Sequence, residues 1–435
     1  MAADERVTNR ARSPLVPALA LICLAGYVFV YASGRTGPPI RSDGFSYYVY
    51  LPAWFIYGDT RLSSVANDCC GGEFPEFSAI IKWPRTRRWV NAHPIGVAVL
   101  QTPFFLTAHG LTHWTNLSAD GFTLYYQHAA GLSGLAWTIV GLFILRRVLR
   151  RHFTDRVSDL TIVALLFGTN LYHYATYDST YSHSYSFALF AALIDLTERW
   201  HAAPTKRSAV MIGVVSGLIL LTRHTNAIFL TIVPLYGLSL RRPGQTLDFL
   251  RDQWRLLALM AATTLVIVAP QLAIYYQATG RVLVSSYGAL GFTFASPHLF
   301  GVLFSVQKGL FFWSPLLLLA LAGLPMLRGS ARGFLLPAAV IFALDTYLIA
   351  SWWDWQFGGS YGHRGFVDLF PVLAIGLAAY FEWSARRPVR QVVVSVVTTL
   401  LVVLSTLQML QYWNRVLPYS DVTWEQYRTL FLRLQ

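Results

Sequence analysis

The sequence predicts an all-α polytopic membrane protein with about eleven transmembrane helices. Of the 435 residues, 55% are hydrophobic and only 13% are charged, about half the charged share of a typical soluble domain. The apolar residues cluster into blocks of about 17 to 23, the length that crosses a hydrocarbon core as helix. Because no long polar stretch separates these blocks, we expect one continuous transmembrane domain over residues 1–435.

The positive charge of the chain fits a membrane topology. A net charge of +13 and a pI of about 9.7 would suggest nucleic-acid binding in a soluble protein. Here most Lys and Arg residues lie in short links between apolar blocks, which is the topology signal of a membrane protein. The three cysteines include no CxxC pair and so give no zinc-ligand spacing. Cys69 and Cys70 are adjacent in the first long loop, where a disulfide is an open alternative.

The basic links fix the expected orientation. We expect spans at about 15–33, 124–146, 158–173, 183–199, 208–222, 225–240, 255–275, 308–327, 332–351, 366–383 and 391–412. The links on one side carry Arg146, Arg147, Arg150, Arg151, Lys206, Arg207, Arg241, Arg242, Arg328, Arg332, Arg386, Arg387 and Arg390. The positive-inside rule makes this side cytoplasmic. Eleven spans then leave the C-terminal tail, 413–435, outside.

The first outer loop, about 34–123, is predicted to hold interfacial helices. The block at about 94–113 contains Pro103, and it ends in His109 and His113. If this block crossed the membrane, every later loop would invert and the arginine links would face outside. The block at about 44–57 is rich in tyrosine and tryptophan, which favour the headgroup layer. We therefore assign both blocks to amphipathic helices at the membrane surface.

Asp43 is the first candidate catalytic residue. It follows Pro38 and Pro39 and precedes Gly44, so we expect it at a rigid turn close to the membrane. A carboxylate in this position could act as a general base for an incoming hydroxyl. The alternative is a structural N-cap, because an aspartate just before a helix caps it well.

A second polar loop, 172–183, joins two helices on the predicted outer side. It contains one acid, two histidines and four tyrosines in twelve residues. Such groups supply both the donors and the acceptors that sugar hydroxyls need. Asp178 is therefore a second candidate catalytic residue, with Tyr177 and His183 as candidate sugar contacts. The alternative is an aromatic belt with satisfied histidines.

Three basic residues at the outer ends of spans are candidate phosphate ligands. Lys308 would act as a point charge, whereas Arg223 and Arg364 present planar forks suited to a phosphate. For Lys308 and Arg223 the alternative is a helix-end residue that snorkels or anchors at the membrane surface.

The segment 351–364 is the most informative stretch of the sequence. Three tryptophans bracket an acid, and a glycine-rich turn then leads into a histidine and an arginine. The aromatic faces can stack on sugar C–H surfaces, and the glycines let backbone approach a ligand closely. The predicted sugar or acceptor contacts in this segment are Trp353, Asp354, Tyr361 and His363.

This order of features resembles the GT-C superfamily of membrane glycosyltransferases, which includes protein mannosyltransferases and the aminoarabinose transferases that act on lipid A. A first helix leads to an acid, Asp43, and interfacial helices precede the second span. A second polar loop carries Asp178, and a late loop, 352–364, carries aromatic residues and a basic residue. The run 91–96, followed by Pro103-Phe104-Phe105, is similar to the interfacial helix of many bacterial members.

The resemblance implies an inverting transfer of a sugar from a polyprenyl-phosphate donor to an acceptor hydroxyl on the periplasmic face. Asp43 would be the general base, and Lys308, Arg364 and, more weakly, Arg223 would hold the donor phosphate. No cofactor is implied; no paired carboxylates are apparent, and a divalent metal stays open. The short loops and arginine-rich links favour a bacterial inner membrane. The sugar stays open, as does the acceptor, which could be a glycan, a lipid or a protein.

Some features leave other functions open. The Trp352-Trp353-Asp354 triplet is similar to the WWD of oligosaccharyltransferases, but Phe45 stands where those enzymes have a second acid. A transporter or flippase of a lipid-linked sugar would need charged or broken helices near the midplane and an inverted repeat. Asp345 and Asp195, within or near spans, keep that alternative in view. An oligosaccharide ligase or polymerase is the third alternative, and it predicts a dominant late loop.

Overall fold

Long apolar helices dominate the computed structural model, which describes residues 14–238, 243–284 and 291–435. Within these ranges, six helical segments are long and apolar enough to cross a membrane. They are α1 (Leu15–Ala32), α6 (Leu124–His152), α13 (Trp254–Thr279), η4 with α17 (Gly329–Ala350), η5 with α18 (Arg364–Ser384) and α19 (Pro388–Trp413). Each coincides with a predicted span, and the all-α membrane class is confirmed.

The other five predicted spans correspond to shorter or more polar helices. Two are apolar pairs: η2 and α11 over His224–Leu235, and α16 and η3 over Leu316–Met326. The other three are α7 (Asp155–Phe167) followed by α8 (Leu171–Thr176), then α9 (Ser182–Ala202) and α10 (Lys206–Thr222). Because α9 is enclosed by α6, α10 and α18, it needs no apolar lipid-facing surface. The number eleven stays a prediction; residues 239–240 of one span, with Arg241 and Arg242, lie outside the described residues.

Small residues allow the closest helix contact in the core. The helices α16 (Leu316–Gly323) and α18 (Phe370–Ser384) pack against each other. A Cβ atom on Gly323 would lie 1.9 Å from the carbonyl oxygen of Gly376, and one on Gly376 would lie 2.3 Å from that of Ala320. Glycine at both positions therefore brings the two backbones together, as is common between membrane helices.

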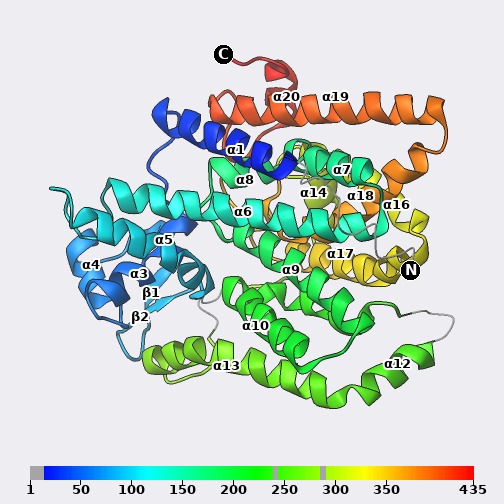
Figure 1. Cartoon of the computed structure of the whole chain (residues 1–435). Helices are drawn as coiled ribbons and strands as arrows, with labels where there is room; N and C mark the ends of the chain where they lie inside the picture. The colour runs from blue at the N-terminus through cyan, green and yellow to red at the C-terminus, as the bar shows by residue number, and fades with distance from the viewer. Residues whose placement is uncertain (1–13, 239–242, 285–290) are drawn as a thin grey trace.

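The first long loop folds against one end of the bundle, which we call the loop end (Figure 1). Its elements are α2 (Asp43–Tyr48), α3 (Tyr50–Phe55), α4 (Ser63–Cys70), η1 (Glu76–Ser78), β1 (Ile80–Lys82), β2 (Trp89–Asn91) and α5 (Gly96–Thr112). The two strands are antiparallel, and Ile80 pairs with Asn91. The expected helices at 44–57 and 94–113 are present as α2 with α3 and as α5. The α4 helix and the hairpin were not predicted, and Cys69 and Cys70 form a disulfide.

The α5 helix returns along the first half of α6. The indole nitrogen of Trp137 donates to the carbonyl oxygen of Leu100 at 3.2 Å, and the ring of His109 contacts the hydroxyl of Tyr126. Since these pairs come from the N-terminal half of α6, α5 does not run the length of the bundle. Its location at a membrane surface stays a prediction.

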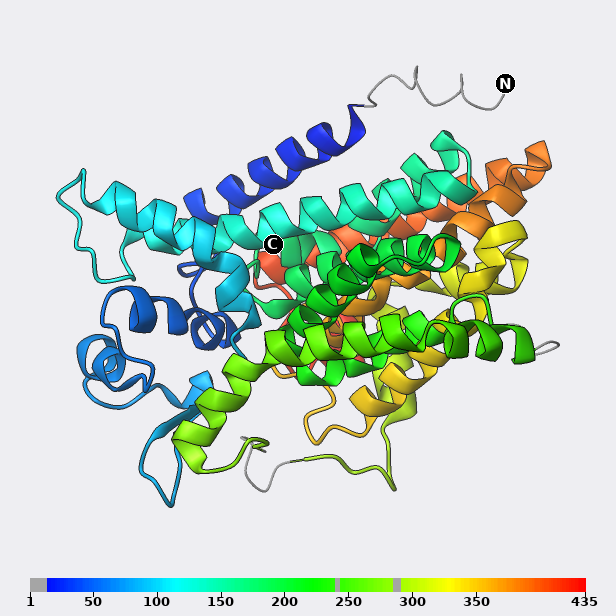
Figure 2. The ribbon, with the colours of Figure 1, turned by 60° about the horizontal axis from the view of Figure 1, so that its bottom comes forward.

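The opposite end of the bundle, which we call the arginine end, gathers several of the predicted cytoplasmic links. Arg147 and Arg151 pair with Asp195 at 2.6 and 2.7 Å, and Arg151 also reaches Glu198 at 2.6 Å. Asp195 thus serves as the partner of arginines at the end of α9. The short helix α12 (Pro243–Asp252) also lies at this end (Figure 2).

The C-terminal tail, 413–435, folds back against the loop end and contains α20 (Trp424–Leu430). The side chain of Asn414 accepts a hydrogen bond from Arg35, just after α1, and its amide donates to the carbonyl oxygen of Leu434 at 2.8 Å. Gln411 of α19 donates to the carbonyl oxygens of Leu430 and Arg433 at 2.6 and 2.8 Å. The tail is therefore an ordered part of the fold.

Candidate active site

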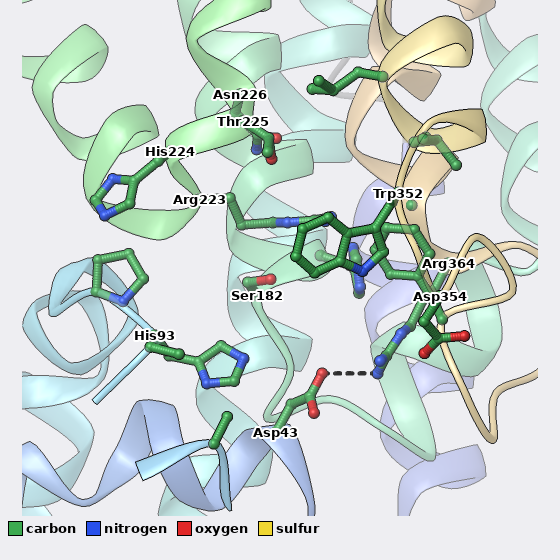
Figure 3. Close-up of a pocket in the computed structure, with 18 of the residues that line it drawn as sticks. Asp43, His93, Ser182, Arg223, His224, Thr225, Asn226, Trp352, Asp354 and Arg364 are labelled. Atoms are coloured by element: carbon green, nitrogen blue, oxygen red, sulfur yellow. Dashed lines mark ion pairs between the residues drawn. The ribbon is translucent and has the colours of Figure 1, made fainter. Parts of the chain in front are cut away.

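A cavity of about 380 Å³ lies between the first loop, the turn after α10, and α17 with the segment that follows it (Figure 3). This volume lies in the range of pockets that bind small molecules. The cavity brings together six of the predicted site residues, which are Asp43, His183, Arg223, Trp353, Asp354 and Arg364.

Aromatic residues form part of the cavity rim. The segment before α14 (Leu299–Phe304) pairs with the end of α17, where Phe292 forms a β-bridge with Trp352. The backbone N–H of Trp353 donates to the carbonyl oxygen of Gly291 at 3.0 Å. Phe292 and Trp353 are 38% and 47% exposed. The rim thus offers flat apolar faces next to the polar interior.

The backbone around Asp43 places its carboxylate in the cavity wall, facing Arg364 (Figure 3). Asp43 is the first residue of α2, and its Oδ2 lies 2.9 Å from Nη1 of Arg364. A Cβ atom on Gly44 would lie 2.1 Å from Oγ1 of Thr180, so glycine permits this close packing. Ser42 occupies the N-cap position with a φ of 47°, a costly conformation for a residue other than glycine. The carboxylate of Asp43 is therefore paired with Arg364 and does not cap the helix.

The cavity combines an ionised carboxylate with a neutral imidazole. Burial raises the pKa of Asp43, but the charge of Arg364 and smaller contributions from His93, His183 and Arg223 together lower the pKa below its usual value. Burial lowers the pKa of His93 to about 4, so its ring is neutral at pH 7. Among the described residues, Nδ1 of His93 has no hydrogen-bond partner. A bound hydroxyl could therefore interact with both side chains.

His93 was quoted in the sequence analysis only as part of the run 91–96, and its place in the site was missed. The side chain of Asn91 accepts from the backbone N–H of His93 at 2.9 Å and donates to the carbonyl oxygen of Ser46 at 2.7 Å. The hydroxyl of Tyr50 donates to the carbonyl oxygen of His93 at 2.9 Å. The strand β2 is thus tied to α2, and this connection holds His93 beside Asp43.

Two guanidinium groups converge on one aromatic ring. The guanidinium carbon of Arg223 lies 5.4 Å from the ring centre of Phe357, and that of Arg364 lies 5.7 Å from it. Phe357 has a φ of 57°, and Gly358 follows with a φ of 60°. In the described part of the chain, Nε of Arg364 has no hydrogen-bond partner. The two arginines therefore form a cationic wall that can accept an anion such as a phosphate.

Asp368, which the sequence analysis missed, organises the cavity from behind. Its Oδ1 accepts from Nδ1 of His183 at 2.7 Å, and its Oδ2 accepts from Asn226 at 3.0 Å and Arg223 at 3.3 Å. The residue is fully buried. The available signal was an acid inside a predicted span, four residues after Arg364, since such acids are functional candidates by default.

The candidate catalytic residue Asp178 is not among the described residues that line the cavity. Its Oδ1 lies 2.7 Å from Nη2 of Arg41, and its Oδ2 lies 2.9 Å from Nε2 of His173. The indole of Trp413 donates to Nδ1 of His173 at 2.9 Å. Because an indole N–H can only donate, Nδ1 must accept, and Nε2 carries the proton toward Asp178. This chain of contacts joins α19 to Arg41, two residues before Asp43.

Tyr177 belongs to the same packing. Its carbonyl oxygen accepts from Arg41 at 2.9 Å, and the guanidinium carbon of Arg41 lies 5.0 Å from its ring centre. Its ring also stacks on Trp413 at 5.7 Å. Tyr177 is not among the described residues that line the cavity, and its predicted sugar contact stays a prediction.

Replacement of Asp178 by asparagine is expected to destabilise the fold by about 2 to 4 kcal/mol, because the buried partner of Arg41 loses its charge. Thermal unfolding of the purified protein in detergent measures this change. Asp354→Asn is the control, since Asp354 lines the cavity and its replacement should change stability by less than about 1 kcal/mol. An Asp178→Asn variant that is fully stable yet inactive would instead support the catalytic role predicted from the sequence.

Lys308 lies beside the cavity rather than in its wall, between α14 and α15 (Leu310–Trp313). Its ammonium donates to the carbonyl oxygens of Ser360 and Tyr419, the latter at 2.8 Å. The backbone N–H of Ser360 also donates to the carbonyl oxygen of Tyr419 at 3.2 Å. Lys308 thus joins the C-terminal tail to the segment that carries Arg364. Its predicted phosphate contact stays a prediction.

The stability of the protein should depend on pH through Lys308. Burial lowers the pKa of Lys308 from 10.5 to about 7. Between these values the unfolded chain binds more protons than the folded chain, so this residue's contribution to stability rises with pH. We expect the melting temperature of the wild type, relative to Lys308→Met, to rise between about pH 7 and about pH 9. Lys206→Met, which replaces an exposed lysine, is the control. If the difference in melting temperature between wild type and Lys308→Met does not change with pH, the expectation is contradicted.

Tyr361 and His363 belong to the segment that carries Arg364, and both are buried. The hydroxyl of Tyr361 donates to the carbonyl oxygen of Ser405 at 2.7 Å. The ring of His363 packs 5.5 Å from Phe357 and 4.8 Å from Phe366. Neither is among the described residues that line the cavity, and their predicted sugar contacts stay predictions.

The cavity therefore provides the ionised carboxylate of Asp43, the neutral imidazole of His93, two guanidinium groups and several aromatic faces. Among residues 14–238, 243–284 and 291–435, no group of three or more His, Cys, Asp or Glu side chains is placed to hold a metal ion. A carboxylate can accept a proton from a hydroxyl, and paired guanidiniums can stabilise a developing oxyanion.

Comparison with known proteins identifies a structural neighbour but no sequence relative. No protein-family model matches the chain, and no curated protein sequence matches it. The fold is similar to the crystal structure of ArnT from Cupriavidus metallidurans in the apo state, with a TM-score of 0.53 and 13% sequence identity. The alignment covers 88% of this chain and 62% of the ArnT chain, so this chain spans less than two thirds of that protein. The chain has a GT-C-like fold, as the order of features in the sequence predicted.

Proposed function

We propose that the chain is an inverting membrane glycosyltransferase that moves a sugar from a polyprenyl-phosphate donor to an acceptor hydroxyl. The observation that carries the proposal is the pair formed by Asp43 and Arg364 in the wall of the cavity, 2.9 Å apart. A general base and a cationic group for the leaving phosphate must lie close to one anomeric carbon. The GT-C-like fold supports this assignment.

In the proposed reaction, Arg364 and Arg223 bind the donor phosphate. When the bond between the anomeric carbon and the phosphate oxygen breaks, both electrons go to that oxygen. The donor is a phosphodiester with one negative charge. The polyprenyl phosphate that leaves is a monoester and carries a second negative charge. Two guanidiniums fixed against Phe357 stabilise that charge without reorganising.

Asp43 takes the proton of the acceptor. The hydroxyl oxygen bonds to the anomeric carbon on the face opposite the phosphate, so the configuration inverts. Because Arg364 keeps the pKa of Asp43 low, proton transfer occurs late, after the attacking oxygen has become acidic. The neutral ring of His93 provides a second hydrogen-bond partner for that hydroxyl.

The other predicted residues have different places in this proposal. His183, Trp353 and Asp354 line the cavity and contact the sugar or the acceptor. Asp178 and Lys308 act from outside the cavity, where they hold the backbone that carries the reacting groups. The donor tail would extend into the bilayer, and the cavity would face the periplasm of a bacterial inner membrane.

The test is sugar transfer in liposomes from a panel of polyprenyl-phosphate monosaccharides, with wild type compared with Asp43→Asn. Transfer or donor hydrolysis by the wild type that disappears in the variant supports the proposal and names the sugar. Translocation of one donor across the liposome membrane without turnover would overturn it in favour of a flippase. Growth of an oligosaccharide from a diphosphate donor would instead favour a ligase or polymerase.

A further inference from the structure

Besides Asp43 and Asp354, the cavity is lined by a third acid, Asp345, whose surroundings differ from those of Asp43. Asp345, Leu348 and Ile349 line it, and their spacing of i, i+3 and i+4 places them on one face of α17. Asp345 lies five residues before the end of α17 at Ala350, or about 7.5 Å along the helix axis, and Trp352 lines the cavity just beyond that end. It therefore lies deeper in the bundle than the aromatic rim.

Asp345 is buried but incompletely bonded. It is 4% exposed, and its Oδ2 has no hydrogen-bond partner within the part of the chain that the structure describes. An unpaired polar atom inside a membrane-spanning helix is costly. Since this residue lines the cavity, a molecule bound there can supply the missing donor.

The neighbouring acid Asp368 shows what a structural carboxylate looks like in this fold. Both of its oxygens accept hydrogen bonds, from His183, Asn226 and Arg223. Asp345 lies close enough to Asp368 and Arg223 to interact with them electrostatically, yet its Oδ2 is left without such a bond. The contrast indicates that Asp345 serves a ligand rather than the fold.

We propose that Asp345 is a sugar-recognition residue whose Oδ2 accepts a hydrogen bond from one ring hydroxyl of the donor. The inference rests on the proposed function and names the group of the substrate that is read. A hydroxyl can donate to the Oδ2 atom that has no other partner among the described residues, and Leu348 and Ile349 beside it suit the C–H surface of a sugar ring. Arg364 and Asp43 hold the phosphate and the acceptor, and Asp345 selects the sugar.

The experiment pairs Asp345→Leu with donors that each lack one ring hydroxyl. For the complete donor we expect kcat/KM to fall about 10-fold, the usual effect of losing one hydrogen bond. For the donor without the recognised hydroxyl, the wild type should lose a similar factor and Asp345→Leu should lose little more. Asp345→Asn, which keeps one acceptor oxygen, should restore part of the activity.

Stability and binding separate this role from a structural one. Asp345→Leu should melt at the same temperature as wild type or higher, because replacing a buried polar group by an apolar one of similar size is often neutral or stabilising. Thr346→Val, a buried neighbour that is not among the lining residues, is the matched control. Binding of the donor should raise the melting temperature, and the size of this rise measures recognition of the sugar without turnover. The rise should be smaller in Asp345→Leu than in wild type and unchanged in Thr346→Val.

Two results would overturn the inference. One is an unchanged kcat/KM for the complete donor in Asp345→Leu. The other is that removing any ring hydroxyl lowers the kcat/KM of Asp345→Leu by the same factor, so that no hydroxyl depends on Asp345. If Asp345→Leu does not fold, the same series in Asp345→Asn decides between these results. A wild type that transfers no sugar from any donor would refute the proposed function instead. In that case the donor-induced melting shift still shows whether Asp345 contacts the sugar.

Discussion

Replacement of Asp43 by asparagine is expected to reduce sugar transfer by about 100- to 10,000-fold, the usual contribution of a general base. Asparagine has nearly the same size and keeps one acceptor oxygen, but it cannot take the acceptor proton. Because the carboxylate faces the cavity and is 27% exposed, we expect the variant to fold. Initial rates of transfer from the active donor in liposomes measure the loss.

Donor affinity provides the internal control for Asp43→Asn. If Asp43 acts on the acceptor proton, donor binding should change much less than the transfer rate. Asp252→Asn, which changes an exposed aspartate on α12 that does not line the cavity, should keep the transfer rate. A normal rate in Asp43→Asn would remove this residue from the mechanism.

Replacement of Arg364 by glutamine is expected to weaken donor binding by about 100-fold, because a buried, hydrogen-bonded charge is lost beside the phosphate. The guanidinium carbon also lies 5.3 Å from the ring of Tyr181, so the variant loses packing as well as charge. Titration of the donor, followed by tryptophan fluorescence or melting temperature, gives the affinity. Unchanged affinity would contradict the phosphate role.

The same variant should shift the pH dependence of transfer. Arg364 holds the pKa of Asp43 below its usual value, so in the wild type Asp43 stays ionised well into the acid range. Without that charge, burial dominates and the pKa rises. The acid limb of the rate profile should therefore move to higher pH in Arg364→Gln. Arg364→Lys keeps the charge without the planar fork, so it should restore the acid limb more than the donor affinity.

The sequence was sufficient to predict the long apolar helices and to single out two residues, Asp43 and Arg364, that line the cavity. Hydropathy identified α1, α13 and α19, whose exposed sides are apolar. It was less decisive for α9, because a helix enclosed by others can bury serine and aspartate. Asp43 stood out at the Pro- and Gly-flanked turn of the first loop and Arg364 at the end of a predicted span, although the sequence could not show that they pair.

The remaining parts of the site depend on contacts between distant segments. Asp368 bonds to His183 and Arg223, each of which is more than 140 residues away in the sequence. No local sequence pattern predicts such a contact. Lys308 was predicted as a phosphate ligand and Asp178 as a catalytic residue, because a sequence shows a charge but not its partner. Both roles stay predictions. In the fold the partners are the carbonyl oxygen of Tyr419 and the guanidinium of Arg41.

The ties from Trp413 to His173 and from Tyr419 to Lys308 also bear on how the protein would respond to a protease. The exposed Arg415 lies in the short connection between these two anchor points. A cut after Arg415 would leave the bundle in place, but it would separate the carbonyl oxygen of Tyr419 from α19. The segment before Arg364 would then be held less firmly, so a nicked protein should keep its helices and lose the fixed geometry of the cavity.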